Sequence, residues 1–451
     1  MDKQISKSNS KIIAVDLKAD RDDSSEGEIN DSEDSSLNSI ANVLQKTKSK
    51  AVESAKKSKP EILSKEVKNL NNVLCDLFSA VVETNKDKAN IVVSPFNLYM
   101  SLAMIAEGLK GNSLKEVSGE LHFTSGDLVK KCLLDLVKTI GRNGLQDVSM
   151  KADNWFLTNK NVTVSEKFAE MIKEKYGFKT SSSDLSDPLS IKEIDDRIRE
   201  YTNNEVKQGL SMISPSTFSM LVITAFFKGQ WDQAFDANNT SSQSFTTAAG
   251  KQIDVDMMEK LNMSAGKMSN SHFDYLSIPY KNDSLVFVIE MGKDGKLSQK
   301  PDFVDIVKAA STKTRLLHVC IPKFKVHFSG KMVESIKKAG VSKIFMPSKE
   351  FQGISSHQMN VTNVIHNSFI DIEETGFCTS DDPTESDGDA MEGGFGGGGF
   401  AFQFEAVDEG CGAQAADEEF TANKPFYFHV VEVKNEVILF SGCITDPSTA
   451  K

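Results

Sequence analysis

The sequence predicts an α+β fold in which helices come early and sheets come late. Between about residue 60 and residue 120, apolar side chains recur at steps of three and four, which is typical of amphipathic helices. Beyond Asp153 strand-like runs and helices mix, and from Leu221 onward branched and aromatic strand-like runs dominate. The 39% hydrophobic content of the 451 residues is enough for a sizeable core. We therefore expect helices and sheets to segregate within the fold.

The first folded element is expected to be a helix that follows Pro60. Its apolar stripe consists of Val67, Leu70, Leu74, Leu77 and Val81. A short strand over residues 91–93 comes next. Ser94 followed by Pro95 then predicts a helix start, because serine caps the free N–H groups and proline suits the first helical position.

Further helix starts are expected downstream. Ser113 and Glu116 have the spacing of a capping box, in which each side chain bonds to the backbone of the other. The run "NWFLT" (154–158) predicts a strand, whereas "VSEKFAEMIKEKYG" (164–177) and "IDDRIREYTNNEV" (194–206) predict helices.

Composition excludes several classes of protein. The net charge of −12 and the pI near 5.3 argue against a nucleic-acid footprint on the folded domain. No apolar run has the length of a membrane span, since the longest candidates, such as residues 285–291, are strand-sized. The first residues lack the apolar stretch of a secretory signal, so we expect a cytoplasmic protein, with a nuclear location or leaderless secretion as alternatives. Six scattered cysteines form no CxxC pair and are expected to be reduced.

Residues 1–60 are expected to form a disordered, charged arm. An acidic, serine-rich patch (20–36) is followed by a lysine-rich one (46–59), and few apolar residues interrupt either patch. Such a stretch buries too little apolar area to offset the entropy of ordering. The lysines could also serve as a nuclear address or contact an anionic surface.

The sequence contains no recognisable catalytic, metal or cofactor motif. "GGFGGGGF" (393–400) is not followed by the helix that a dinucleotide fingerprint requires. "DGD" (387–389) lacks the other ligands of a calcium loop. No nucleophile elbow or HExxH motif occurs. We expect no enzyme activity, no cofactor and no metal.

Several longer stretches share one resemblance. They are "IVVSPFNLYMSLAMIAEGLKGNS" (91–113), "LVITAFFKGQWDQAFDANNTSSQSF" (221–245), "SIPYKNDSLVFVIEM" (277–291), "IPKFKV" (321–326), "VTNVIHNSFIDIEETG" (361–376) and "FTANKPFYFHVV" (420–431). In this order they resemble the serpin superfamily of serine protease inhibitors. The resemblance extends over residues 62–447, nearly everything except the arm.

The resemblance implies a single domain over residues 61–451, with three β-sheets, about eight to nine helices and an exposed reactive-centre loop at about 377–419. It also implies a mechanism. A serine or cysteine endopeptidase cleaves the loop, and the loop then inserts as a new central strand of the large sheet. The protein is expected to act as a monomer. His366 resembles a histidine that serpins keep near the top of that sheet, where it is expected to be a hydrogen-bonded structural group; a pH-sensing role in loop release is the alternative.

The loop hinge departs from the family pattern. The hinge residues are Glu373, Glu374, Gly376, Phe377, Cys378 and Thr379, and Phe377 replaces a small residue. The register that the resemblance implies turns Phe377, Thr379, Asp381, Pro383 and Glu385 inward. A buried carboxylate costs several kcal/mol unless it is paired, and proline leaves a ladder acceptor unbonded at ~1–3 kcal/mol. We therefore expect poor insertion.

The loop is also about twice the family length, and its glycine tract adds slack. A second stretch of hinge-like composition comprises Asp408, Glu409, Gly410, Ala413, Ala415 and Ala416. It is either a duplicated or decayed hinge or a coincidence of small residues. The candidate residues for the scissile bond are Met391, Phe395, Phe400, Phe402 and Phe404, all suited to a chymotrypsin-like pocket.

Two functions follow from these observations. The first is a serpin that faces an endopeptidase through its loop but traps it poorly. The alternative is a non-inhibitory serpin that serves as a binding or chaperone-like scaffold, since fold alone does not fix function.

Overall fold

A computed structural model gives the structure of the chain and describes residues 65–122, 148–201, 217–281, 284–297, 300–376 and 418–450. The predicted arm lies outside these ranges. All the described residues belong to one unit of the chain, Leu63–Lys451. Within them, no helix has the length and apolar character needed to cross a membrane.

The large sheet has five strands in the order β10-β11-β4-β2-β3. Their bounds are β10 Phe324–Lys331, β11 Asn363–Ile372, β4 Ser219–Gly229, β2 Val148–Asn159 and β3 Lys179–Ser183. The central pair, β11 and β4, is parallel, whereas β11 is antiparallel to β10 and β4 is antiparallel to β2. Two parallel strands therefore lie directly side by side in the middle of the sheet.

Eight of the other nine described strands form a continuous path, β1-β14-β13-β8-β7-β6-β9-β12, and the ninth, β5, pairs with β6 off this path. Their bounds are β1 Asn90–Val93, β5 Ser241–Thr246, β6 Gln252–Ser269, β7 Phe273–Pro279, β8 Leu285–Gly292, β9 Arg315–Pro322, β12 Glu419–Thr421, β13 Phe426–Glu432 and β14 Val437–Ile444. β6 pairs with β5 and β9 along most of its length but with β7 at its end. This long strand links two groups of strands, β1-β14-β13-β8-β7 and β9-β12 with β5; with the five-stranded sheet they correspond to the three sheets that the resemblance implied.

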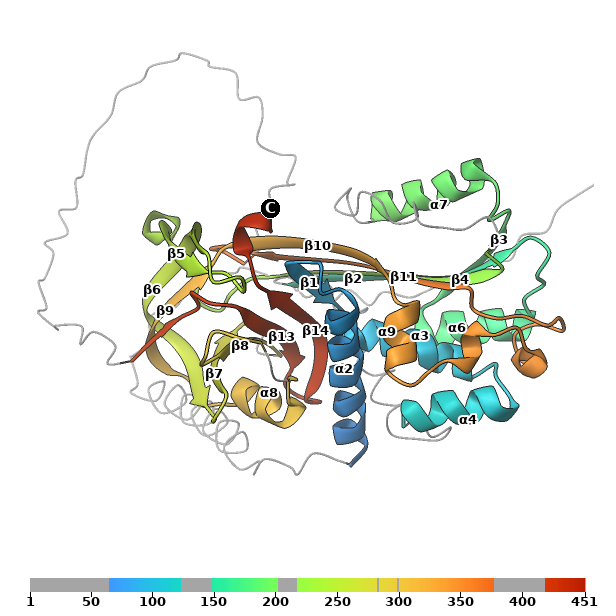
Figure 1. Cartoon of the computed structure of the whole chain (residues 1–451), viewed down its shortest axis with the longest axis horizontal. Coiled ribbons are helices and arrows are strands. Elements are labelled where there is room, and N and C mark those ends of the chain that lie inside the picture. The colour runs from blue at the N-terminus through green and yellow to red at the C-terminus, as the bar shows by residue number, and fades with distance from the viewer. Residues whose placement is uncertain are drawn as a thin grey trace, which may run out of the picture. The chain divides into compact units, whose positions relative to one another are not determined.

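Seven α-helices lie within the described residues: α2 Lys65–Thr84, α3 Pro95–Ala106, α4 Gly111–Glu120, α6 Glu166–Tyr176, α7 Pro188–Tyr201, α8 Phe303–Ala310 and α9 Val333–Lys338. Figure 1 shows α7 on one side of the large sheet and α3, α4 and α6 on the other. Ile194 and Ile198 of α7 pack on Met220, Val222 and Ile365 of β4 and β11. We call the side that carries α7 the outer face and the opposite side the core face.

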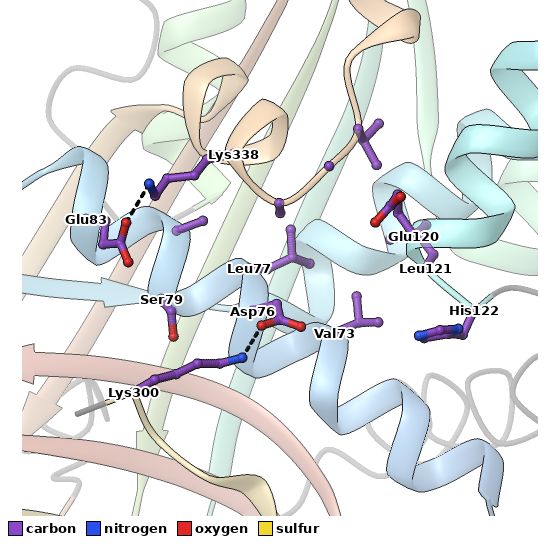
Figure 2. Close-up of a pocket in the computed structure, with 14 residues that line it drawn as sticks. Val73, Asp76, Leu77, Ser79, Glu83, Glu120, Leu121, His122, Lys300 and Lys338 are labelled. Carbon is purple, nitrogen blue, oxygen red and sulfur yellow. Dashed lines mark hydrogen bonds and ion pairs between the residues drawn. The ribbon is translucent and has the colours of Figure 1, made fainter.

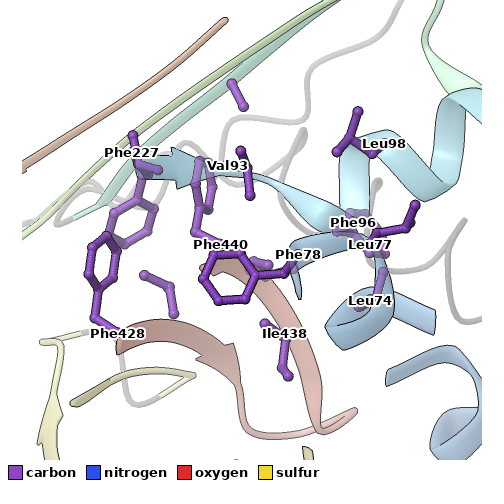
Figure 3. Close-up of a cluster of buried hydrophobic side chains, with 14 of the residues drawn as sticks. Leu74, Leu77, Phe78, Val93, Phe96, Leu98, Phe227, Phe428, Ile438 and Phe440 are labelled. Atoms are coloured by element: carbon purple, nitrogen blue, oxygen red, sulfur yellow. The ribbon is translucent and has the colours of Figure 1, made fainter. Parts of the chain in front are cut away.

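The main core lies between the core face, α2, α3 and the strands β13 and β14. Leu70, Leu74, Leu77 and Val81 of the predicted α2 stripe are buried there, whereas Val67 is only partly buried. Phe227 of β4 packs against Phe440 of β14. Figure 3 shows these aromatic side chains with Phe78 of α2 and Phe96 of α3. Trp231 and Phe235 also belong to this core and are 2% and 4% exposed.

One predicted helix start is confirmed and another is wrong. Ser94 caps α3, with its side chain accepting from the Asn97 N–H, and Pro95 opens the helix. α4, in contrast, begins at Gly111, so Ser113 lies inside the helix and forms no capping box with Glu116. The Glu350 carboxylate takes the capping role instead and accepts from the N–H groups of Asn112 and Ser113 at 2.9 and 2.7 Å.

Glu116 is also used elsewhere. Its carboxylate accepts from the backbone N–H groups of Ser342 and Lys343 at 3.0 and 2.7 Å. At the start of α4, the carboxylate of the distant Glu350 therefore takes the place of the predicted Ser113–Glu116 capping box, because it satisfies two free helix N–H groups at once.

Candidate functional site

The candidate site is the pair of anchors from which the predicted loop leaves and returns, together with the seam between β4 and β11. The chain continues from the end of β11 at Ile372 through Gly376, and the description resumes at Glu418, one residue before β12. Residues 418 and 419, assigned to the loop by the sequence, therefore belong to its second anchor.

The first anchor follows β11 and is held by the turn after β4. The Trp231 indole N–H donates to the Glu373 carbonyl at 2.8 Å, and its backbone N–H donates to the Thr375 carbonyl at 3.3 Å. The Phe235 N–H donates to the Glu374 carbonyl at 2.8 Å. These bonds fix the backbone at the point where the loop begins.

The Glu374 side chain adds a second set of contacts to the first anchor. Its carboxylate accepts from Lys323 Nζ at 2.7 Å and from Thr240 Oγ1 at 2.8 Å. Burial raises the pKa of this carboxyl, but the hydrogen bonds from Lys323, its own backbone and Thr240 outweigh burial and hold the pKa below its ordinary value. Glu374 is thus ionised and tied to two other segments at neutral pH.

Gly376 closes the first anchor in a conformation that favours glycine. Its φ is +79°, and a Cβ atom there would lie 2.2 Å from the Gly229 carbonyl oxygen at the end of β4. Any other residue would meet both the strained backbone and this contact. The backbone conformation and the close contact with Gly229 therefore explain why the hinge position assigned by the resemblance is a glycine.

The second anchor is centred on Glu418. Its carboxylate accepts from Arg315 at 2.7 Å and lies 3.5 Å from Lys267 Nζ. The Glu418 carbonyl accepts from the His318 N–H, and Lys267 donates to the Glu419 carbonyl, both at 2.9 Å. The chain then continues as β12, which pairs in parallel with β9.

One strand, β9, joins the two anchors. Arg315, which holds Glu418, is its first residue, and Lys323, which holds Glu374, directly follows its last. Eight residues of extended strand place the anchors roughly 25 Å apart.

The seam between β4 and β11 begins beside the first anchor. Eight residue pairs are in register, from Asn363 opposite Met220 to Ile370 opposite Phe227. On the outer face, Lys228 Nζ of β4 lies 3.6 Å from the carboxylate of Asp371 of β11. The two strands are therefore joined by side chains as well as by their backbones.

His366 lies on the core face of this seam. It is the fourth residue of β11, opposite Ile223 and Gly330, and thus in the middle of the sheet and not near the top, where the loop leaves. Its Nε2 accepts from the Ser94 N–H at the start of α3 at 3.0 Å. Complete burial lowers the pKa of His366 to about 3, so the imidazole is neutral.

A model of the serpin family (serine protease inhibitor) matches residues 68–447. The chain belongs to the serpin family. The match covers both anchors and the seam of this serpin.

Individual relatives agree with the family match. A serine protease inhibitor of Cyanea capillata is 26% identical over 392 residues, which are 82% of this serpin and 96% of the relative. An uncharacterized serpin-like protein of Methanosarcina mazei is 25% identical over 394 residues, 85% of this serpin and 88% of the relative. The crystal structure of uncleaved ovalbumin, 18% identical, has a TM-score of 0.71 and covers 84% of this serpin and 99% of ovalbumin. Protease inhibition is the activity that characterises the family.

The structure describes only part of the predicted site. Glu373, Glu374 and Gly376 form the first anchor, and His366 lies below it in the seam. The other candidates lie outside the described residues; these are Phe377, Cys378, Thr379, the second hinge (Asp408, Glu409, Gly410, Ala413, Ala415, Ala416) and the scissile-bond candidates (Met391, Phe395, Phe400, Phe402, Phe404). Sequence reasoning missed Lys323, Thr240, Arg315 and Lys267, because nothing local marks a charge whose partner is distant in the chain.

One buried group has the composition of a hydrolase triad. His429 Nδ1 lies 2.9 Å from Ser441 Oγ, and its Nε2 lies 3.2 Å from the Glu290 carboxylate, which also accepts from the Tyr275 hydroxyl. All four side chains are at most 2% exposed. No substrate reaches such a serine, so the group is a buried polar network of the core.

A cavity of about 400 Å³ lies beside α2, away from the anchor residues. Figure 2 shows Asp76 paired with Lys300 and Glu83 paired with Lys338 at its edge. Within the described residues, no cluster of three or more potential metal ligands occurs here or elsewhere.

Proposed function

We propose that this serpin presents the segment between Gly376 and Glu418 to a serine or cysteine endopeptidase. After cleavage, the part that follows Gly376 enters the large sheet between β4 and β11. The observation that carries the proposal is the parallel seam: β11 runs directly into the segment, and its neighbour β4 runs in the same direction. A chain that turns back at Gly376 is antiparallel to both strands.

Hydrogen bonding favours such an entry. Insertion replaces one parallel ladder of eight residue pairs by two antiparallel ladders, which pair slightly better per residue. The gain is on the order of eight hydrogen bonds, at ~1 kcal/mol each. Ordering eight backbone residues costs ~1–2 kcal/mol apiece, which offsets this gain. Side-chain burial in the seam therefore decides whether the inserted state is the more stable one.

The side chains next to the first anchor work against insertion. The core face of the seam carries Ile223, Ala225 and Ile370 together with the polar His366 and Ser368. The two polar side chains already bond to the Ser94 N–H and to the Val92 carbonyl, so these described residues suit apolar or small partners and offer no cation to a carboxylate. The sequence offers Asp381, Pro383 and Glu385 in the register that the family implies. We therefore propose that the protease cleaves this serpin more often than it is trapped.

The length of the loop also lowers the expected efficiency of trapping. The 41 residues from 377 to 417 connect anchors that are only about one strand length apart. Trapping requires that insertion pulls the acylated protease before water releases it. A long, glycine-rich tether transmits that pull poorly.

The test is incubation of the full chain with a panel of serine and cysteine endopeptidases, followed by denaturing electrophoresis. We expect cleavage between residues 377 and 417, with a small fraction of gel-stable acyl complex for a chymotrypsin-like member of the panel. A chain that no protease cleaves in this segment would contradict the proposal and favour the scaffold function. Complete trapping would contradict only the expected inefficiency.

A further inference from the structure

Thr224 of β4 and Asn367 of β11 face each other across the seam. Both alternate with core-face residues and so lie on the outer face, where their side chains are 1% and 0% exposed. Within the part of the chain that the structure describes, Thr224 Oγ1 and Asn367 Nδ2 have no hydrogen-bond partner. Buried polar groups are rarely left unbonded, because they lose their water without compensation.

The neighbouring strands explain why neither group is satisfied. Ser329 of β10 donates to Asn367 Oδ1 at 2.8 Å, which leaves the planar amide with its NH₂ group on the side of β4. Beside Thr224, the carboxylate of Asp153 on β2 accepts from Lys179 and from the Trp155 indole, both at 2.8 Å, and makes no hydrogen bond to the Thr224 hydroxyl. Two unused polar groups are thus left at one level of the seam.

Strand entry would change the surroundings of this pair. An inserted strand separates β4 from β11 by one further strand spacing, ~4.8 Å. Its outward side chain at this level then lies between Thr224 and Asn367. The amide NH₂ group can only donate, and the threonine hydroxyl can also donate. A short side chain with an acceptor oxygen satisfies both groups, whereas an apolar one leaves both unbonded.

We propose that Thr224 and Asn367 determine which strand the seam accepts. The preferred occupant is an extended segment with asparagine or aspartate facing outward at their level. The proposal rests on the proposed strand insertion and specifies its side-chain preference. Asp382 of this chain lies outside the described residues; in the register that the resemblance implies, insertion would turn its carboxylate to the side on which this pair lies.

The test uses the full chain and acetylated, fluorescent decapeptides of alternating threonine and alanine. In three series, a single leucine, asparagine or aspartate is moved along the outward positions. Incorporation is followed by co-migration on native gels and by the rise in the melting temperature. We expect one position at which the asparagine and aspartate peptides are incorporated about tenfold better than the leucine peptide, the effect of about one buried hydrogen bond.

Variants then locate the preference. Thr224→Val keeps the shape of the side chain, and we expect it to weaken the preference several-fold; adding Asn367→Leu should abolish it. Thr158→Val is the matched control, because Thr158 Oγ1 is also buried without a partner but lies on β2, away from the seam. Circular dichroism checks that each variant is folded. If Thr224→Val folds poorly, the three peptide series on the unaltered chain still decide.

Three outcomes overturn the proposal. Equal incorporation of all peptides rejects the side-chain preference and leaves strand insertion intact. A preference that survives in the double variant rejects these two residues. Failure of every peptide to enter, including the parent peptide, rejects both this inference and the proposed insertion.

Discussion

Phe226 of β4 and Phe369 of β11 stack across the seam, with ring centroids 5.0 Å apart and an interplanar angle of 21°. Lys228 Nζ lies 5.7 and 5.6 Å from the two ring centroids and pairs with Asp371. Lys325 also lies over Phe369 and pairs with Asp371, but it belongs to β10. Separation of β4 from β11 therefore breaks the contacts of Lys228 with β11 and leaves those of Lys325 intact.

This difference gives a matched pair of variants. Lys228→Met should accelerate entry of the threonine–alanine decapeptide about fivefold, because cross-seam contacts of ~1 kcal/mol no longer resist opening. Lys325→Met removes the same charge from the same cluster and should leave the rate nearly unchanged. The rate is measured by native gel at equal peptide concentration. Equal acceleration in both variants would show that net charge and not the cross-seam contact controls opening.

The Glu374–Lys323 pair should contribute measurably to stability. A double-mutant cycle with Glu374→Gln and Lys323→Met should give a coupling energy of about 1 kcal/mol in urea unfolding at pH 7, since the pair is partly exposed. The folded pKa of Glu374 is lowered, so its contribution is present above the ordinary pKa of 4.5 and is lost as pH falls through the lowered value.

The coupling should accordingly weaken as the pH falls below 4.5 and disappear once the Glu374 carboxyl is protonated in the folded chain. Glu373→Gln serves as the control: its carboxylate acts on Lys323 by charge alone, and the hydrogen bond of this residue to Trp231 is made by its backbone carbonyl, so its coupling to Lys323 should be smaller than that of Glu374. A coupling that persists in strong acid would contradict the assigned ion pair.

The buried His366 should make the free energy of unfolding depend on pH over a second, higher pH range. Burial lowers its pKa to about 3 in the folded chain, against the ordinary 6.5. The unfolded chain therefore binds the proton first, and stability falls as the pH drops from 6.5 towards 3. Between pH 7 and pH 5 the loss from this group is ~2 kcal/mol. His366→Gln keeps an acceptor for the Ser94 N–H and should flatten this part of the profile, as followed by urea unfolding at each pH. An unchanged slope would contradict the prediction.

Repair of the hinge should restore trapping. Replacement of Phe377–Glu385 by small threonine and alanine residues removes the inward carboxylates and the proline, and deletion of about twenty residues across the glycine tract shortens the tether. The combined variant should form gel-stable complexes with a protease that merely cleaves the original chain. Either change alone should do less.

The controls for the repaired chain are equal protease occupancy and a check of folding. Its melting temperature should rise sharply after cleavage, whereas that of the unaltered chain should change little. Cleavage without trapping in the repaired chain would locate the defect in the large sheet and not in the hinge.

Local signals predicted the elements well where neighbouring residues determine them. The stripe from Val67 to Val81 became α2, and Ser94 with Pro95 opened α3. The capping box at Ser113 failed because Glu350, far away in the sequence, binds the same N–H groups more completely. The resemblance supplied the number of sheets and the place of the loop, which periodicity alone does not reveal.

The contacts of the site were less predictable for the same reason. Lys323 stands within a stretch that carried the resemblance, yet its partner Glu374 lies 51 residues further on. The unsatisfied hydrogen-bonding groups of Thr224 and Asn367 can be recognised only once the strand register is known. The sequence predicts which segments pair. Only the three-dimensional structure shows which polar atoms between them have no hydrogen-bond partner.

The position of β9 between the anchors has a mechanical consequence. An extended strand lengthens very little under tension, and β9 is further stiffened by β6 on one side and β12 on the other. A partner that pulls on the chain at Glu418 therefore loads Arg315 and, through the strand, Lys323 at its opposite end. A force on the contact between Arg315 and Glu418 therefore also acts on the contact between Lys323 and Glu374. Force applied to the chain at Glu418 is thus transmitted along β9 to the contact between Lys323 and Glu374 at the first anchor.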